Sequence, residues 1–351
     1  MTKSFDPAAP GSAADGIFGL PFTEKDASLV YLPVPWEATT SYGGGTSMGP
    51  SAILEASAQL DLYDFDVLKP YEPGLFLLPE SPAVRAWNKE AKKAAQLVIK
   101  ALLAGKPSPR KALDLVNRLG DRLNAYVEKE TERLYESGKI PAIIGGDHST
   151  PYGAIKAAAK RHPGMGILHF DAHHDTRAAY EGFTWSHASI FYNVLNDLPA
   201  VAKLVQVGIR DFSEQEAAFC AAQEERVAVF YDGDLARRRF AGEPFDAVAQ
   251  EIAEALPKDV WVTFDIDGLD PRFCPHTGTP VPGGLEFSEA NHVLGAVARS
   301  GRRIVGFDLN EVAPDPAGKN EWDANVGARL LYKMTGWALA SQGLAKTRDA
   351  A

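Results

Sequence analysis

Short runs of apolar residues recur along the chain and alternate with longer stretches of helical periodicity. The first run covers 28–33, and later ones cover 141–146, 165–170, 203–208, 226–230, 259–266 and 303–309. Nearly continuous apolar runs of this length are typical of strands buried on both faces, and their alternation with helices indicates a parallel sheet. The pattern predicts an α/β protein in which helices cover both faces of a mainly parallel sheet, a three-layer α/β/α sandwich.

Two further segments stand out between these runs. Residues 35–50 are a long Gly-rich loop, in which three consecutive glycines at 43–45 permit unusual backbone angles or a close approach to a ligand. Residues 84–138 have helical periodicity and composition, with Gly138 as the expected helix stop.

The ends of the chain differ from its middle. Residues 1–27 are rich in Gly, Pro, Ala and Ser, so we expect an irregular N-terminal arm. No repeat, low-complexity tract or linker interrupts the rest of the sequence. We therefore expect one folded domain over 28–340 and a short C-terminal tail at 341–351.

Composition and charge narrow the class of protein. Of the 351 residues, 45% are hydrophobic and 23% are charged, which is ordinary for a globular protein and excludes a disordered or fibrous one. The formal net charge is −10 and the longest basic run is 237–239, so a nucleic-acid binder is not expected. An acidic balance favours metal ions or small cationic molecules as ligands.

Cysteine content and the N-terminus bear on localisation. Cys220 and Cys274 are too few for a disulfide framework, which favours a reducing compartment. The first residues contain Pro and Gly where a signal peptide needs an apolar stretch, and no apolar run approaches the roughly 20 residues of a membrane helix. We therefore expect a cytoplasmic protein that binds neither membranes nor nucleic acid.

Polar side chains concentrate at the carboxyl ends of the expected strands, where sites form in sheets of this class. His148 follows one run, Asp171, His173 and Asp175 follow the next, and Asp265 and Asp267 end a third. Residues two apart in an extended segment point to the same side, about 6.5 Å apart. These strand ends would therefore bring four carboxylates and two imidazoles to one locus.

Carboxylates this close together would repel one another and raise each other's pKa unless cations lay between them. Two divalent ions would offset the four charges, and two of the carboxylates are available as bridges. An oxygen-rich set with two imidazoles and no thiolate suits Mn²⁺, and also Ni²⁺, Fe²⁺ or Zn²⁺. An isolated Asp-His pair is more often a turn or helix cap, but the joint occurrence of the set favours a metal centre.

The remaining histidines outside this set have structural explanations, apart from His187. His169 lies within an apolar run, so we expect a hydrogen-bonded core residue rather than a ligand. His174 points away from its neighbours and should support the site from behind. His162, His276 and His292 are expected on the surface or in loops.

Three motifs resemble the signature motifs of the ureohydrolase family, which contains arginase, agmatinase and related guanidino-group hydrolases. They are GGDHS at 145–149, FDAHHDT at 170–176 and FDIDGLDP at 264–271, and the resemblance covers 28–340 in motif order. It implies the arginase-like fold, with a mainly parallel eight-stranded sheet, and two metal ions per chain, normally manganese.

The resemblance also implies how each metal ion is held. One ion would be bound by His148, Asp171, Asp175 and Asp265, and the other by Asp171, His173, Asp265 and Asp267. Asp171 and Asp265 would then be the bridging ligands.

Three residues would carry the chemistry of such an enzyme. Two metal ions can generate hydroxide at neutral pH, and Asp175 would orient it and accept its proton. His187, in WSHAS at 185–189, would protonate the departing amine, because an unperturbed imidazole pKa of about 6.5 suits that transfer. By resemblance, Glu311 would bind the guanidinium group of the substrate.

The loops narrow the substrate. Where agmatinases have Asp-His-Gly-Thr this chain has Ser-His-Ala-Ser, and 176–185 lacks the Asn and Ser donors with which arginases bind the amino-acid tail. WEATTSYGGGT (36–46) and NEWDANVG (320–327) resemble the guanidine-hydrolase branch, which includes nickel-dependent guanidine and metformin hydrolases. The resemblance implies Ni²⁺ or Mn²⁺ and a compact guanidine or biguanide, cleaved to urea or a urea derivative plus ammonia or an amine.

A small, partly aromatic pocket would suit such a substrate. We expect it to be formed over the metals by Trp36, Thr40, Phe183, Trp185 and Trp322. A planar guanidinium can lie against aromatic faces, and such a pocket would exclude a zwitterionic tail.

Other functions stay open at this point. An agmatinase or guanidinobutyrase acting on a longer chain would be favoured by a second acidic or polar anchor in the loops. A deacetylase of the same fold would use one zinc ion, which the presence of both His148 and Asp267 disfavours. A non-catalytic partner subunit would lack a ligand, whereas the set here is complete. The expected partners are a small cationic guanidino substrate and either identical copies, in a homo-trimer or hexamer, or a paralogous subunit.

Overall fold

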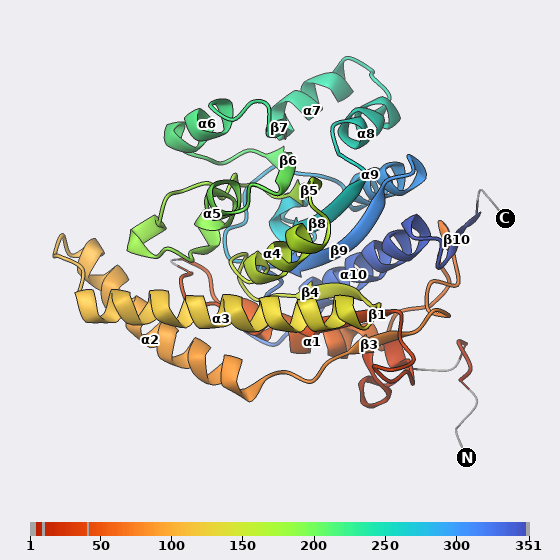
Figure 1. The fold of residues 1–351 in the computed structure, drawn as a ribbon, viewed down its shortest axis with the longest axis horizontal. Coiled ribbons are helices and arrows are strands. Elements are labelled where there is room, and N and C mark those ends of the chain that lie inside the picture. The colour runs from red at the N-terminus through yellow and green to blue at the C-terminus, as the bar shows by residue number, and fades with distance from the viewer. Residues whose placement is uncertain (1–4, 9–10, 41, 349–351) are drawn as a thin grey trace.

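The structure is a computed structural model that describes residues 5–8, 11–40 and 42–348. Eight strands form one sheet in the order β3-β1-β4-β9-β8-β5-β6-β7, and every neighbouring pair is parallel (Figure 1). Helices cover both faces of the sheet. The predicted three-layer α/β/α sandwich with an eight-stranded sheet is therefore confirmed.

The strands lie where the apolar runs predicted them, with one addition. The sheet consists of β1 (Leu29–Pro33), β3 (Leu75–Leu77), β4 (Ile140–Ile144), β5 (Met165–Phe170), β6 (Val201–Ile209), β7 (Val227–Tyr231), β8 (Asp259–Asp265) and β9 (Arg303–Asn310). The edge strand β3 was not predicted, because three residues are too short to give an apolar run. Two short strands, β2 (Val67–Leu68) and β10 (Lys346–Thr347), pair antiparallel beside the main sheet.

The segment predicted as helical over 84–138 forms two helices, α2 (Pro82–Leu103) and α3 (Arg110–Glu136). The chain turns between them at 104–109, where Pro107 and Pro109 cannot continue a helix. The two helices lie side by side as a hairpin, orange and yellow in Figure 1.

The other helices complete the two outer layers. They are α1 (Gly49–Ser57), α4 (Tyr152–Arg161), α5 (Ile190–Asp197), α6 (Glu214–Ala221), α7 (Asp232–Phe240), α8 (Phe245–Glu254), α9 (Phe287–Arg299) and α10 (Trp322–Ser341). Helices α1, α8, α9 and α10 pack on one face of the sheet, and α3, α4 and α5 pack on the other.

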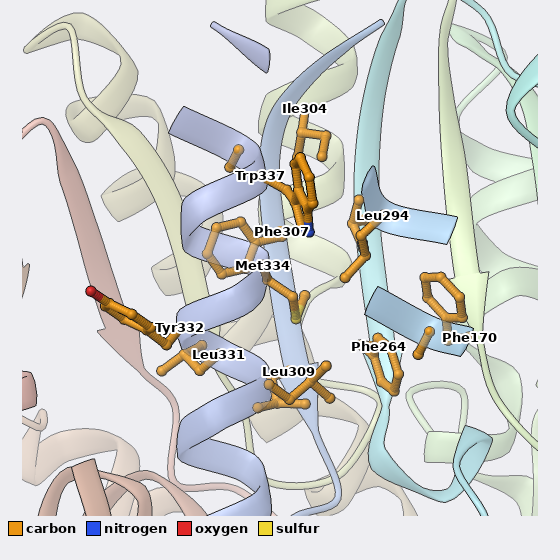
Figure 2. Close-up of a cluster of buried hydrophobic side chains, with 14 of the residues drawn as sticks. Phe170, Phe264, Leu294, Ile304, Phe307, Leu309, Leu331, Tyr332, Met334 and Trp337 are labelled. Atoms are coloured by element: carbon orange, nitrogen blue, oxygen red, sulfur yellow. The ribbon is translucent and has the colours of Figure 1, made fainter. Parts of the chain in front are cut away.

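Side chains alternate between these two cores along each strand. In β5, Ile167 faces the side of α3 and α4, whereas Leu168 and Phe170 face the side of α9 and α10. Figure 2 shows the core on the side of α9 and α10, where α10 packs against β9. In this core Phe170 stacks on Phe264, with ring centroids 4.6 Å apart. Burying each such side chain stabilises the fold by about 1.5–3 kcal/mol.

Both terminal segments contact this core. In the N-terminal arm, Ile17 and Phe18 are buried, and the Phe18 ring lies 5.0 Å from that of Tyr332 in α10. In the C-terminal tail, β10 pairs with β2. Within the described ranges, no helix combines the length and apolarity that a membrane crossing requires.

Candidate active site

The strands that carry the motifs are neighbours in the sheet. Strands β4, β9, β8 and β5 lie side by side in that order, and because they are parallel their carboxyl ends share one edge. His148 follows β4, Glu311 follows β9, Asp265 ends β8 and Asp171 follows β5. The sheet order thus brings together residues that are up to 163 positions apart in the sequence.

The turn after β4 depends on two glycines. A Cβ on Gly146 would lie 1.8 Å from the carbonyl oxygen of Trp36, and one on Gly145 would lie 1.9 Å from Oδ1 of Asn310. A larger residue would separate the turn from the neighbouring loops. The GG of the first motif therefore allows His148 to reach the centre of the site.

His148 points one ring nitrogen at three carboxylates. Its Nδ1 lies 3.0 Å from Asp171, 3.2 Å from Asp175 and 3.4 Å from Asp265, and the side chain is buried. On the other side of the ring, Nε2 lies 2.8 Å from Oγ1 of Thr263, which donates to Asp308. This contact fixes the ring orientation, as outer hydrogen bonds do for metal-ligating histidines.

A second group of ligand atoms adjoins the first. Nδ1 of His173 lies 3.2 Å from Oδ1 of Asp171 and 3.2 Å from Oδ2 of Asp267. Asp267 is held by the backbone N–H of Ala172, which donates to its Oδ1 at 3.0 Å. Asp171 therefore faces both His148 and His173, one with each carboxylate oxygen.

His169 supports Asp171 from within β5. Its Nε2 lies 2.8 Å from Oδ2 of Asp171, and its Nδ1 accepts from Nε2 of Gln206 at 2.9 Å. Gln206 also holds His174, whose Nδ1 lies 2.7 Å from Oε1 of the amide. These buried contacts orient the carboxylate that lies between the two groups.

The local backbone is strained at two of the predicted functional residues. Asp175 and Glu311 adopt positive φ angles of 54° and 61°, which are uncommon for residues other than glycine. The surroundings hold both residues: the carbonyl of Asp175 accepts from Phe191 N–H, and Glu311 N–H donates to Gly146. Strain of this kind clusters at functional sites.

Burial and mutual repulsion dominate the electrostatics. Desolvation and the charge of Asp171 raise the pKa of Asp175 to about 7. Desolvation, with Asp267 and Asp171, raises the pKa of Asp265 well above its usual value. For His148, burial acts to lower the pKa, but the carboxylates outweigh it and hold the pKa well above the usual value. The cluster thus favours additional positive charge.

The donor set fits divalent cations. Ligand atoms of His148, His169, Asp171 and Asp175 lie within 4.8 Å of one another, as do those of Asp171, His173 and Asp267. Both groups contain Asp171, so the arrangement could hold two ions that share this carboxylate. Oxygen and imidazole donors without a thiolate suit Mn²⁺ or Ni²⁺ chemically.

A cavity of about 190 Å³ adjoins the cluster. Its lining includes His148, His173, Asp175, Asp265, Arg177, Tyr180, His187, Asp211, Glu216, Thr279 and Glu311. A narrow extension of about 10 Å³ lies next to it between Thr40, Gly43 and Gly278, and His187 and Glu311 line both spaces.

Glu311 presents an unpaired oxygen in this region. Its Oε1 accepts from His148 N–H at 3.0 Å, whereas its buried Oε2 has no hydrogen-bond partner among the described residues. Desolvation, with the charges of Asp265 and Asp147, raises the pKa of Glu311 well above its usual value. A cationic hydrogen-bond donor would satisfy this carboxylate.

The pKa of His187 is lower than the ordinary imidazole value on which its predicted role was based. Ser186 caps the short turn His187–Ser189, and Thr39 Oγ1 lies 3.4 Å from Nδ1 of His187. Desolvation, with positive charge on His173 and His148, lowers the pKa of His187 to about 4. A neutral imidazole at pH 7 can relay a proton, but it does not hold one in advance.

The structure brings together only part of the expected pocket. Thr40 lines the narrow extension, but Trp36, Phe183, Trp185 and Trp322 line neither space. Trp36 is buried in the core, and Trp322 is half exposed, with its Nε1 donating to the carbonyl of Arg272.

Phe183 and Trp185 are anchored on the helical hairpin instead. Phe183 is fully buried among Ala95, Val98 and Val116 of α2 and α3. Trp185 lies against Gly120 of α3, and its Nε1 donates to Asp121. The aromatic pocket expected from the sequence is therefore wrong: these side chains bury apolar surface away from the charged cluster.

Sequence reasoning missed other residues that line the cavity. Arg177 and Tyr180 belong to the same loop as Phe183, and the Arg177 guanidinium lies 4.8 Å from the centre of the Tyr180 ring. Glu216 pairs with Arg177 at 3.2 Å, and Asp211 lies nearby. For Arg177 and Tyr180, the only signal in the sequence was their position in the loop that follows Asp175. Nothing in the sequence distinguished Asp211 or Glu216.

An α/β/α sandwich with a cluster of aspartates and histidines at its strand ends defines a metal-dependent hydrolase with an acidic cavity. Residues 27–336 match the Arginase family, and the chain belongs to that family. It is accordingly a metal-dependent ureohydrolase that acts on C–N bonds of guanidino compounds. The family uses two divalent metal ions, typically Mn²⁺.

Similar proteins cover nearly the whole chain. The N(1)-aminopropylagmatine ureohydrolase of Thermus thermophilus is 32% identical over 90% of this chain and 94% of its own. The agmatinase of Bacillus subtilis is 29% identical over 89% and 91%, respectively. The agmatine ureohydrolase structure from Thermoplasma volcanium shares the fold with a TM-score of 0.70, at 22% identity over 95% of this chain and 96% of that one.

Proposed function

We propose that this enzyme hydrolyses a compact guanidino compound without a carboxylate: guanidine, an N-alkylguanidine or a biguanide such as metformin. The products would be urea or a urea derivative plus ammonia or an amine. The unpaired Oε2 of Glu311 carries the proposal, because a buried carboxylate beside the cluster suits a planar cation with several N–H donors.

We propose His148, Asp171, His173, Asp175, Asp265 and Asp267 as the ligands of two ions, Ni²⁺ or Mn²⁺. When bound, the ions would supply a water molecule activated for attack on the guanidinium carbon. Five of these side chains lie in the two groups of ligand atoms, and Asp265 lies 3.4 Å from Nδ1 of His148. The raised pKa values of Asp175 and Asp265 support this assignment too.

The protein side chains would carry the protons. Asp175 would accept the proton of the attacking water, because burial and the charge of Asp171 raise the pKa of its carboxyl to about 7 and so favour its protonation. The leaving nitrogen needs a proton before the C–N bond breaks, and neutral His187 would relay one to it. Glu311 would hold the guanidinium over the reacting water.

The preference for a compact substrate rests on the narrow part of the cavity. Gly43 N–H donates to the carbonyl of Gly278 at 3.2 Å, so the Gly-rich loop lies against the 278 region beside Glu311. The remaining extension of about 10 Å³ is too small for an alkyl chain, which supports a substrate with no tail on this side of Glu311.

An agmatinase-type activity is the second candidate. Asp211 and Glu216 line the cavity and supply the acidic anchor that an ammonium tail would require. Relatives that are named agmatinase and aminopropylagmatine ureohydrolase favour this candidate too. Arg177 opposes it, because its guanidinium pairs with Glu216 and so already compensates the charge of that anchor.

One screen separates the candidates. Protein loaded with Ni²⁺ or Mn²⁺ would be assayed for release of ammonia, urea and amine from guanidine, dimethylguanidine, metformin, agmatine and arginine. We expect the highest kcat/KM for guanidine, dimethylguanidine or metformin. Glu311→Gln should lower kcat/KM for every compound that the wild-type enzyme hydrolyses. If agmatine or arginine is the best substrate, the compact-substrate proposal is wrong, while the metal-site assignment survives.

A further inference from the structure

We infer that Glu37 and Lys92 are positioning residues, through which helix α2 holds the Gly-rich loop against His187 and Glu311. The loop in question comprises residues 37–40 and 42–46. Neither Glu37 nor Lys92 lines the cavity or its extension. The inference rests on the proposed function in one respect: it takes His187 as the proton relay and Glu311 as the residue that binds the guanidinium.

Glu37 ties the two ends of this loop together. The side chain is buried, with the residue 5% exposed, although it lies in a loop. Its Oε2 accepts the backbone N–H of Gly45 at 2.6 Å and the hydroxyl of Thr46 at 3.4 Å. A single carboxylate at the start of the loop therefore fixes the loop's end.

Helix α2 supplies the counter-charge. Lys92 Nζ forms an ion pair with Oε1 of Glu37, and Oδ1 of Asn88 accepts the backbone N–H of Glu37 at 2.8 Å. Asn88 and Lys92 are four residues apart, so both project from the same side of the helix. Glu37 is thus held to α2 through its backbone and its side chain.

The attachment extends to the reacting groups. Two residues beyond Glu37, the Thr39 hydroxyl lies 3.4 Å from both the backbone N and Nδ1 of His187. Thr40 and Gly43 then form one wall of the narrow extension, which Glu311 also lines. Loosening the loop from α2 would free the contact that orients the His187 ring and open the wall beside Glu311.

Two variants test this arrangement, one that removes only the positive charge and one that removes the whole ion pair. Lys92→Met leaves Glu37 charged and unpaired, whereas Glu37→Gln combined with Lys92→Met removes both charges. Lys93→Met is the matched control, because Lys93 is the exposed neighbour on the same helix. The assay uses whichever guanidino compound the wild-type enzyme turns over, so failure of the compact-substrate proposal leaves the test intact.

We expect Lys92→Met and the double variant to lower kcat/KM by about ten- to a hundredfold, because small misplacements of catalytic groups have effects of that size. Metal content should stay at the wild-type value, and Lys92→Arg should restore part of the activity. Hydrogen exchange at 42–46 should accelerate in both variants and not in Lys93→Met.

If Lys92→Met fails to fold, the double variant still tests the inference, because the double variant contains no unpaired buried charge. If the folded double variant has wild-type kcat/KM and wild-type exchange in the loop, the inference is overturned. Loss of activity that follows loss of bound metal would overturn it as well, because the pair would then act on the metal site rather than on the loop.

Discussion

Replacing Phe183 with alanine separates two accounts of the loop before His187. If Phe183 lined the substrate pocket, the variant would raise KM and leave stability almost unchanged. In the structure the ring is fully buried between α2 and α3, among Ala94, Ala95, Val98 and Val116. The variant should therefore act on folding.

The expected size follows from that environment. Truncating a fully buried Phe typically costs about 3–5 kcal/mol, through lost apolar burial and the cavity left behind. Small residues, Ala94 and Ala95, form part of the surrounding wall, so neighbouring side chains have little length with which to fill the space. We expect a loss near the middle of that range. Trp322→Ala, at a position 48% exposed, should cost less than about 1 kcal/mol.

Urea denaturation of the metal-loaded enzyme, followed by tryptophan fluorescence, gives the loss of unfolding free energy. Initial rates below the transition give KM for the folded fraction, with Trp322→Ala as the exposed aromatic control. A Phe183→Ala enzyme of wild-type stability whose KM is raised tenfold would refute this account of the loop.

The remaining predictions concern the site itself. Asp265→Ala should remove at least one metal ion per chain by elemental analysis and abolish turnover; full metal content would contradict the proposal that its carboxylate binds metal. His187→Ala should lower kcat by about 10² to 10⁴ with metal content unchanged, and unaltered turnover across pH would exclude proton relay. Gly120→Val should displace the Trp185 ring, because even a Cβ at this position would lie 2.6 Å from the ring. We expect a lower kcat with bound metal retained, whereas wild-type kcat would show that the contact between Gly120 and Trp185 does not orient His187.

The strands and the motifs at their ends could be predicted because both signals are local. An apolar run such as 165–170 needs no distant contact to identify it, and the alternation of Asp171, His173 and Asp175 follows from strand geometry. The order of the strands could not be derived in this way. Only the folded sheet places β9 between β4 and β8 and so brings Glu311 to His148.

The pocket was harder to predict because burial decides which way a loop side chain turns. Phe183 and Tyr180 are three residues apart in one loop, yet the first packs into the hairpin and the second lines the cavity. Similarly, the pKa of His187 depends on desolvation by residues from other parts of the chain. Sequence spacing carries no information on either point.

The hairpin of α2 and α3 has a consequence for how substrate preference can change. It holds the Gly-rich loop through Lys92, and it holds the segment before His187 through contacts with Phe183 and Trp185. Two of the loops that border the cavity thus rest on one pair of helices. Selection for a new substrate can therefore act on positions of this hairpin far from the cavity. Such changes would reposition the loops and leave the aspartates and histidines at the strand ends intact.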